Sequence, residues 1–352
     1  MDSAREIGAL PVRAPARPTG TGAPERSHTS AMRSVDRSEF ITQWAPSLVL
    51  VVLVLGFSLA NPNFLSLSNL GRMSIAATPA LMVALGVTFI IIMGSIDLSM
   101  EGTVATTAVL FAIVFNQFGG ALLGWAWLAI PAALLAGAVI GLINGVAHVK
   151  LKIPSFMASL AIGFVGIGLS VLLTGGDIVR VNDDVFRALL LERVFGFPLM
   201  VYVAIVVVLL AWFIQRKTTI GRNFYAVGGG EDLAHASGLN VQRVRIVGFA
   251  LAGVFYAIGA ILAVARAGMA EALTGSNYMF VSITSVVVGG TSLMGGNGGV
   301  WKTVVGVLIV NVINNGMVVI GLPRYVQDGV LGVLVIIAVV LSTNRRSLSL
   351  VK

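Results

Sequence analysis

The sequence contains no cysteine and very little charge. Of its 352 residues, 11% are charged and 57% are hydrophobic, and the mean hydropathy is +0.95. A soluble domain of this length needs far more charged surface, so the chain must use lipid as its solvent. The absence of cysteine excludes disulfides, thiolate metal sites, iron–sulfur clusters and cysteine nucleophiles. The 41 glycines are typical of membrane helices that pack closely.

Metal ligands and nucleotide motifs are scarce as well. The three histidines, His28, His148 and His235, lie far apart without ligand spacing, so we predict no metal site and no cofactor. Residues 296–303 resemble a phosphate-binding loop only superficially, because Trp301 stands where that motif needs glycine before the lysine. We therefore expect a non-catalytic protein that does not hydrolyse ATP itself.

Charged residues divide the chain into tails and apolar segments. Residues 1–40 lack any apolar run and predict a disordered cytosolic tail; 41–344 form the expected transmembrane domain and 345–352 a cytosolic C-terminal tail. The charge-free stretches are 40–71, 73–96, 102–149, 153–176, 194–215, 246–265, 272–301, 303–323 and 329–344. A span needs about 20 apolar residues. Because 102–149 suffices for two spans with a turn at 116–120, we predict an all-α integral membrane protein of about ten helices.

The distribution of basic residues predicts the orientation. Ten passes place both termini on one side of the membrane, and basic residues concentrate on the cytosolic side. The inner group would be Lys150, Lys152, Arg216, Lys217, Arg222, Arg243, Arg245, Lys302, Arg345, Arg346 and Lys352. The six outer arginines are balanced by six acidic residues. This bias puts both termini in the cytosol, and it explains the net charge of +8 without nucleic acid as a partner. Membrane lipid is an expected partner instead.

The spans carry almost no ionisable groups in their interiors. Ion-coupled carriers usually hold such groups there, whereas only Asp97 and Glu101 interrupt the first third of this bundle. No selectivity-filter sequence is visible either. The energy for transport is expected to come from another protein, and a secondary carrier or facilitator acting alone is the alternative.

The longest inner loop, 216–245, has the pattern of a short helix. The glycines 228–230 predict a flexible stop, Glu231 and Asp232 follow, and Gly238 closes the segment. Acidic residues suit the first turn of a helix and glycine suits the position after the last turn. Such a helix is what a membrane subunit would present to a cytosolic motor, and an ordinary helical loop is the alternative.

Several segments together resemble a known family. The run from Gly221 to Gly229, continued by Glu231 and Ser237-Gly238, is similar to the coupling loop of ribose-type ABC permeases. The other similar segments are Ile96-Asp97-Leu98-Ser99, Pro154-Ser155-Phe156 with Ala158-Ser159-Leu160, Gly289-Gly290-Thr291-Ser292-Leu293 with Gly295-Gly296, and Asn314-Asn315-Gly316. The resemblance covers about residues 45–342. Gly230 stands where the family commonly has Asn, and Asp232-Leu233 replace two alanines. These departures leave the expected role of the loop intact and affect which ATPase the loop fits.

The resemblance implies a bundle with half-helices and a cytosolic coupling helix in the cytoplasmic membrane. It implies ATP-binding cassette ATPase subunits, an extracytoplasmic sugar-binding protein and a second permease subunit, in a homodimer or heterodimer, as partners. The expected cargo is a monosaccharide or polyol; a nucleoside, autoinducer-2 or a branched-chain amino acid is the alternative. The residues expected to contact the ATPase are Gly221, Arg222, Tyr225, Gly228, Glu231, Ser237 and Gly238.

Polar and aromatic residues in the apolar segments are candidates for the substrate path. Asp97 and Ser99 can either cap a half-helix or bind a sugar hydroxyl. Asparagine amides can bind a sugar or a neighbouring helix, and an aromatic ring can stack on a sugar or contact lipid. The candidates are Asp97, Ser99, Asn144, Phe156, Asn314 and Asn315. The mixed charge of the outer loop 174–196 suits docking of a binding protein, or simple solvation.

Overall fold

The computed structural model describes residues 37–323 together with 325–327, 329–330, 332–333 and 336. The predicted C-terminal tail, most of the N-terminal tail and most of the tenth apolar segment, 329–344, lie outside the described residues. A compact unit begins at Ile41. The following account concerns the described part of this unit.

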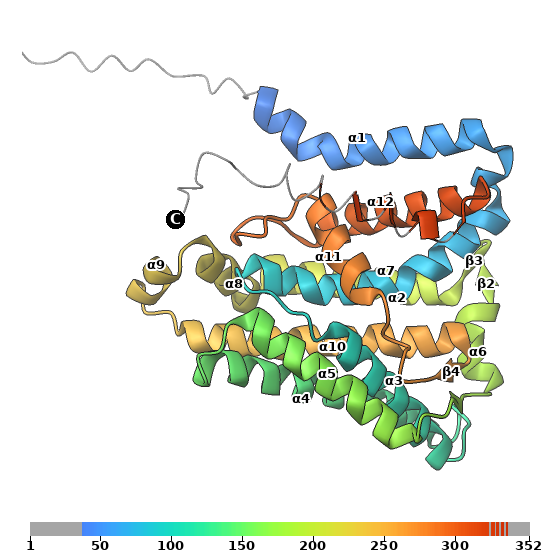
Figure 1. Cartoon of the computed structure of the whole chain (residues 1–352), viewed down its shortest axis with the longest axis horizontal. Coiled ribbons are helices and arrows are strands. Elements are labelled where there is room, and N and C mark those ends of the chain that lie inside the picture. Colours follow the sequence, from blue (N-terminus) through green and yellow to red (C-terminus); the bar gives the residue numbers. More distant parts are fainter. Residues whose placement is uncertain (1–36, 324, 328, 331, 334–335, 337–352) are drawn as a thin grey trace, which may run out of the picture. The chain divides into compact units, whose positions relative to one another are not determined.

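Most residues of the described unit are helical, and its strands have two residues each (Figure 1). Six described helices are long and apolar enough to cross a membrane. They include α2 (Leu67–Ile92), α4 (Ala129–Lys150), α5 (Ser155–Thr174), α7 (Leu199–Lys217), α10 (Val241–Ala267) and α12 (Val300–Val319). The other apolar helices are α1 (Arg37–Ala60), α3 (Met100–Gln117) and α11 (Tyr278–Val288). Helices satisfy their own backbone hydrogen bonds, which a lipid environment requires. The predicted all-α membrane fold is confirmed.

The first helix boundary lies before the predicted position at Arg72. α1 ends at Ala60, and the 3-10 helix η1 (Pro62–Leu65) makes the turn into α2. The side chain of Asn61 caps η1 and the side chain of Ser66 caps α2. Arg72 lies exposed inside α2. An arginine near a helix end can extend its charge to the membrane surface, so a single charge marks a boundary less reliably than capping residues do.

The centre of the bundle consists of α2 and α10. Their most apolar windows are 83% and 67% buried, whereas those of α4, α5 and α7 are each 28% buried and face outward. α10 packs along α4 through glycines: a Cβ added to Gly137 would lie 2.3 Å from the carbonyl oxygen of Gly253. Only small residues allow membrane helices to approach so closely.

Two helices begin inside the bundle. α11 has 11 residues and rises about 16 Å, which is about half of the ~30 Å hydrocarbon core. A coil, residues 271–277, completes this crossing from β4 (Met269–Ala270), which pairs with β1 (Val179–Arg180). α3 begins beside the same coil, because a Cβ added to Gly275 would lie 2.0 Å from the carbonyl oxygen of Glu101. α11 is short enough to be one of the half-helices that the resemblance implies, whereas the 18 residues of α3 rise about 27 Å and come close to a full crossing.

Smaller elements occupy the two ends of the bundle (Figure 1). One end carries α8 (Thr219–Gly229) and α9 (Glu231–Ala236) and is called the α8–α9 end. The opposite end carries η2 (Ala126–Leu128), α6 (Asp184–Leu191) and a hairpin of β2 (Arg193–Val194) and β3 (Phe197–Pro198). The predicted flexible stop at 228–230 is wrong, because Gly228 and Gly229 are helical and only Gly230 separates α8 from α9.

Candidate functional site

Asp97 lies in the non-helical link between α2 and α3, residues 93–99. One carboxylate oxygen accepts hydrogen bonds from the Ser99 N–H at 2.8 Å, the Ser99 hydroxyl at 2.6 Å and the Asn144 amide at 3.2 Å. The other oxygen accepts from the Tyr256 hydroxyl at 3.0 Å. All of these side chains are buried. The structure therefore brings together three candidates for the substrate path and adds Tyr256, which no sequence signal singled out.

The Asp97 cluster connects the link to three long helices. Asn144 belongs to α4 and Tyr256 to α10, while α5 contributes the Ser155 hydroxyl, which accepts from the Ile96 N–H at 3.1 Å. Both carboxylate oxygens of Asp97 are engaged within the chain, which favours a structural role over direct contact with a sugar. The predicted cap is not formed, because the N-cap residue Ser99 makes no side-chain capping hydrogen bond to α3. The side-chain carbonyl oxygen of Asn144 is buried and has no partner among the described residues, so it is an acceptor left for a further donor.

The remaining path candidates lie apart from this cluster. Asn315 on α12 exchanges two hydrogen bonds with Asn69 on α2, at 2.8 and 3.2 Å, and so joins two helices. Asn314 is half-buried, and within the described residues its side chain makes no hydrogen bond. Phe156 lies in the first turn of α5 and is 43% exposed. Asn69 was missed, although it shares the signal used for Asn315, an amide in an apolar segment.

The predicted coupling residues gather at the α8–α9 end. The Thr218 hydroxyl caps α8 by accepting from the Gly221 N–H at 3.3 Å. Glu231 forms an ion pair with Arg245 at 2.7 Å, which connects the first turn of α9 to α10. Gly238 follows α9 and adopts a left-handed conformation with φ +82°, so it closes the short helix as predicted. Arg222 and Ser237, two further members of the set, are exposed and available to a partner at this end.

Tyr225 connects α8 to α7 and to a glycine-rich loop between α11 and α12, residues 289–299. Its hydroxyl accepts a hydrogen bond from the Gln215 amide and donates one to the Gly298 carbonyl, the latter at 2.8 Å. Burial raises the pKa of the Tyr225 phenol, so it stays protonated and keeps its donor role. The position of α8 is thus fixed against the loop by a specific side chain.

Backbone atoms also meet directly at this place. A Cβ added to Gly228 would lie 1.8 Å from the Ile92 carbonyl oxygen and 2.7 Å from the Gly296 nitrogen. A Cβ added to Gly295 would lie 2.9 Å from the Gly94 Cα. The Gly296 N–H donates to the Ile92 carbonyl at 2.9 Å. We call these four glycines the glycine junction.

The glycine junction connects three segments that are remote in sequence. Gly228 belongs to α8, Gly94 to the link that leads into α3, and Gly295 and Gly296 to the loop that follows α11. The contacts join backbone atoms directly, with no side chain between the three segments. The junction therefore places the α8–α9 end in direct contact with the segment that precedes α3 and the segment that follows α11.

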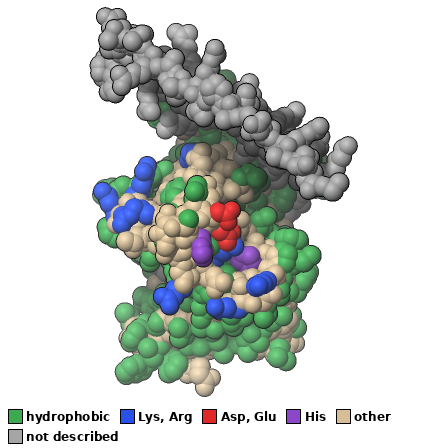
Figure 2. Space-filling model, turned by 90° about the vertical axis from the view of Figure 1, so that its left-hand side faces the viewer, with side chains coloured by type: hydrophobic (Ala, Val, Ile, Leu, Met, Phe, Trp, Pro, Cys, Tyr) green, Lys and Arg blue, Asp and Glu red, His purple; other side chains and the backbone are tan. Residues whose placement is uncertain are grey.

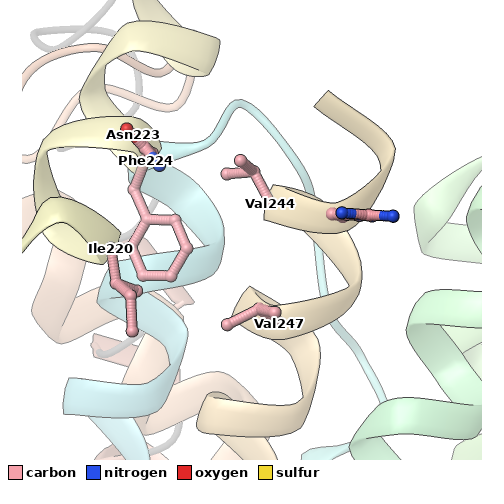
Figure 3. Close-up of a pocket in the computed structure, with 6 residues that line it drawn as sticks. Ile220, Asn223, Phe224, Val244 and Val247 are labelled. Atoms are coloured by element: carbon pink, nitrogen blue, oxygen red, sulfur yellow. The ribbon is translucent and has the colours of Figure 1, made fainter. Parts of the chain in front are cut away.

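The surface of the α8–α9 end is hollowed and carries both charges. Figure 2 shows an acidic patch near its middle with separate basic groups around it. The acidic residues of α9 are Glu231 and Asp232. A cleft of about 160 Å³ lies between α8 and α10 (Figure 3), and a groove of about 340 Å³ lies between α8 and α9. The cleft is lined by Ile220, Asn223, Phe224, Arg243, Val244 and Val247. Shallow apolar hollows with a charged rim suit the docking of a protein partner.

The loop 174–196 at the opposite end is folded onto the bundle. Asp183 caps α6 by accepting from the Phe186 N–H at 2.8 Å, and it also accepts from the Leu122 N–H at 3.3 Å. The Phe186 ring packs against Phe111 and Phe115 of α3. Nowhere in the described part of the chain do three His, Asp or Glu side chains cluster closely enough to hold a metal ion.

Comparison with known proteins gives matches over most of the chain. Residues 69–339 match the family described as branched-chain amino acid transport system / permease component. The ribose import permease protein RbsC of Escherichia coli (strain K12) is 32% identical over 303 residues, 85% of this chain and 93% of that protein. The L-arabinose transport system permease protein AraH of the same strain is 31% identical over 322 residues, 92% of this chain and 94% of that protein. The D-allose transport system permease protein AlsC, also from this strain, is 28% identical over 321 residues, 90% and 96% respectively. No solved structure gives a significant match.

Proposed function

The chain belongs to the family of branched-chain amino acid transport system permease components, and on that premise we propose that it is the membrane-spanning permease subunit of an ABC importer for a monosaccharide. The observation that carries the sugar class is the similarity to ribose and arabinose permeases over 85% and 92% of the chain. The family match over residues 69–339 includes the link 93–99, the loop 289–299 and the α8–α9 end. A branched-chain amino acid is the second candidate, because the family description names it.

ATP hydrolysis belongs to a separate ATPase subunit in this proposal. Lys302, the lysine of the segment 296–303, donates to the Gly290 carbonyl at 3.1 Å and to the Asn297 side chain at 3.2 Å. The Gly296 N–H is engaged with Ile92. A phosphate-binding loop needs such groups free for its ligand, so these contacts support a role in packing instead.

The α8–α9 end is the proposed docking site of the ATPase on the cytosolic side. The excess of basic residues in the loops at this end supports that orientation. Closure of the ATPase subunits would move α8, and the glycine junction would pass this movement to the link 93–99 and the loop 289–299. The helices α3 and α11 would then shift and open the path to one side of the membrane or the other. An extracytoplasmic binding protein would deliver the sugar at the end that carries α6.

The test is reconstitution in proteoliposomes with and without the partner ATPase and binding protein. The complete complex should hydrolyse ATP faster with sugar-loaded binding protein and should concentrate the sugar, whereas the chain alone should do neither. Uphill uptake by the chain alone in an ion gradient would contradict the proposal and favour a secondary carrier. Stimulation only by a receptor loaded with leucine, and not by receptors loaded with ribose, arabinose or allose, would favour the amino acid candidate.

A further inference from the structure

The cleft between α8 and α10 has apolar walls on both sides (Figure 3). Ile220 and Phe224 of α8 form one wall, and Val244 and Val247 of α10 form the other. The outermost of these side chains stay open to the surroundings, since Ile220 is 41% exposed and Val247 is 44% exposed. The volume of about 160 Å³ is below the ~300–1,000 Å³ of a typical small-molecule pocket. A cleft of this size and lining suits a stretch of a thin apolar chain.

The length of α10 places this cleft at the membrane surface. The 27 residues of α10 rise about 40 Å, whereas the hydrocarbon core is ~30 Å thick. A centred helix of this length extends ~5 Å beyond the hydrocarbon at each end. Arg243 lies ~3 Å and Val247 ~9 Å from the start of α10, and residues four apart share a helix face. Arg243 is therefore at the depth of the lipid headgroups, directly above an exposed valine at the edge of the hydrocarbon.

Arg243 is the single charged residue among the six that line the cleft. Its side chain is exposed, and within the described part of the chain its guanidinium makes no ion pair or hydrogen bond. The nearby Arg245, by contrast, is paired with Glu231 at 2.7 Å. A second cation lies close to the start of α10, because the Lys150 ammonium donates to the Gln242 side chain at 3.2 Å. The cleft thus combines apolar walls with positive charge that its own lining does not neutralise.

We propose that the cleft between α8 and α10 binds an anionic phospholipid of the cytosolic leaflet, with an acyl chain along the apolar walls and the phosphate at Arg243. The inference goes beyond the proposed function and rests on it only for the orientation that places the α8–α9 end in the cytosol. Anionic lipids give the cytosolic leaflet its negative surface potential, and basic pockets between membrane helices on that side bind their headgroups. A guanidinium suits a phosphate group because it donates two parallel hydrogen bonds.

The groove between α8 and α9 has a different character. Its lining consists of Tyr225, Ala226, Gly229, Gly230, Leu233, Ala234, Ser237 and Leu239, none of which is charged. All of these residues belong to α8, to α9 or to the turn that follows α9, and none belongs to a membrane-spanning helix. The groove therefore suits the ATPase, whereas the cleft, with one wall on a membrane-spanning helix, suits a lipid.

The test is retention of phospholipid by the full-length chain. The chain is reconstituted in phosphatidylcholine vesicles that contain a minor fraction of phosphatidylglycerol and is extracted in mild detergent, and mass spectrometry measures the phosphatidylglycerol held per chain. Arg243→Gln should weaken retention about tenfold, because it removes the cation that binds the phosphate. Lys152→Gln is the control and should retain the lipid, since Lys152 is an exposed cation between α4 and α5 that does not line the cleft.

A second pair of variants tests the apolar walls. Val247→Trp should lose the phosphatidylglycerol, because the larger ring would fill the cleft. Val139→Trp on α4 is its matched control and should retain the lipid, since Val139 is 43% exposed and Val247 is 44% exposed. Equal retention by all four variants would overturn the proposal. Equal loss in Arg243→Gln and Lys152→Gln would also overturn it, because the lipid would then follow the general surface charge.

Two further measurements distinguish other ligands of the cleft. Inorganic phosphate in excess should leave the phosphatidylglycerol in place, and its displacement by phosphate would contradict a lipid site. Loss of ATPase co-purification in Arg243→Gln with unchanged lipid retention would assign the cleft to the ATPase contact and overturn the proposal. Retention is measured without ATPase or transport, so equal retention by all variants leaves the proposed function standing. A complex that fails to transport sugar would contradict the proposed function and leave the lipid result unaffected.

Discussion

Gly228→Ala should uncouple ATP hydrolysis from uptake, whereas Gly229→Ala should not. The two glycines are neighbours in α8, but their surroundings differ. An added Cβ at Gly228 would lie 1.8 Å from the Ile92 carbonyl oxygen, while one at Gly229 meets nothing within 4 Å. Both residues are helical, so the substitutions differ in the space available and not in backbone strain.

The size of the effect follows from the contact distances. Ordinary contact begins at 3.4 Å, so α8 and Ile92 must separate by about 1.6 Å to accept the methyl group. The opposing atoms at Ile92 and Gly296 belong to the backbone and cannot rotate away. Overpacking of this kind costs about 1–3 kcal/mol. At Gly229 the change should stay below about 1 kcal/mol, because only helix propensity changes.

The assay compares the two variants in the reconstituted complex. Gly228→Ala should reach the membrane and bind the ATPase, but loaded binding protein should stimulate ATP hydrolysis and uptake weakly or not at all. Gly229→Ala should behave like the unmodified chain. Equal and normal activity of both variants would refute the idea that the glycine junction transmits movement. Equal loss in both would point to the surface of α8 instead of the junction.

Three further changes test other contacts. Glu231→Lys should lower stimulated hydrolysis by breaking the pair with Arg245, and Glu231→Arg combined with Arg245→Glu should restore it. The pair is half-exposed, so its effect on stability should stay below about 1 kcal/mol. A double variant no better than the single one would exclude the pairing as the cause. Asp97→Asn should lower the free energy of unfolding by about 1–3 kcal/mol and should lower uptake, because the amide nitrogen of the new side chain cannot accept the hydrogen bonds that the carboxylate accepts. Lost uptake at unchanged stability would instead place Asp97 on the sugar path. Gly238→Val should reduce coupling, because a residue with a Cβ adopts the left-handed backbone conformation of Gly238 at a cost of about 1 kcal/mol. Asn tolerates that conformation, so Gly238→Asn should reduce coupling less. Equal activity of both variants would show that coupling does not depend on the conformation of this turn.

The all-α membrane fold could be predicted because lipid imposes its own rule on every segment. Each apolar stretch up to residue 323 is long enough for at least one helix. In lipid, a helix is the only open arrangement that satisfies the hydrogen bonds of the backbone. The boundary at Arg72 was misplaced because a charge was used as the marker. The physical cause of the turn between α1 and α2 is the pair of capping side chains, Asn61 and Ser66, and both residue types are recognisable capping signals in a sequence.

The role of the glycines at the end of α8 could not be read from the sequence. A run of three glycines predicts flexibility when only neighbours in the chain are considered. Gly228 serves close approach instead, and its partners at Ile92 and Gly296 are remote in sequence. The four hydrogen-bond donors to the Asp97 carboxylate pose the same difficulty. Tyr256 follows the general apolar pattern of α10, and only the packing of α10 beside the link brings its hydroxyl to Asp97.

The link 93–99 explains how a contact at the α8–α9 end can act on α3. At its start, Gly94 lies against Gly295 in the glycine junction. At its end, Leu98 donates to the Ser159 hydroxyl at 2.9 Å and Asp97 is held by α4 and α10. Local rearrangement at the Asp97 end is costly, because it would leave a buried carboxylate without its donors. We therefore expect a displacement of α8 to move α3 as a whole, because breaking the Asp97 cluster would cost more.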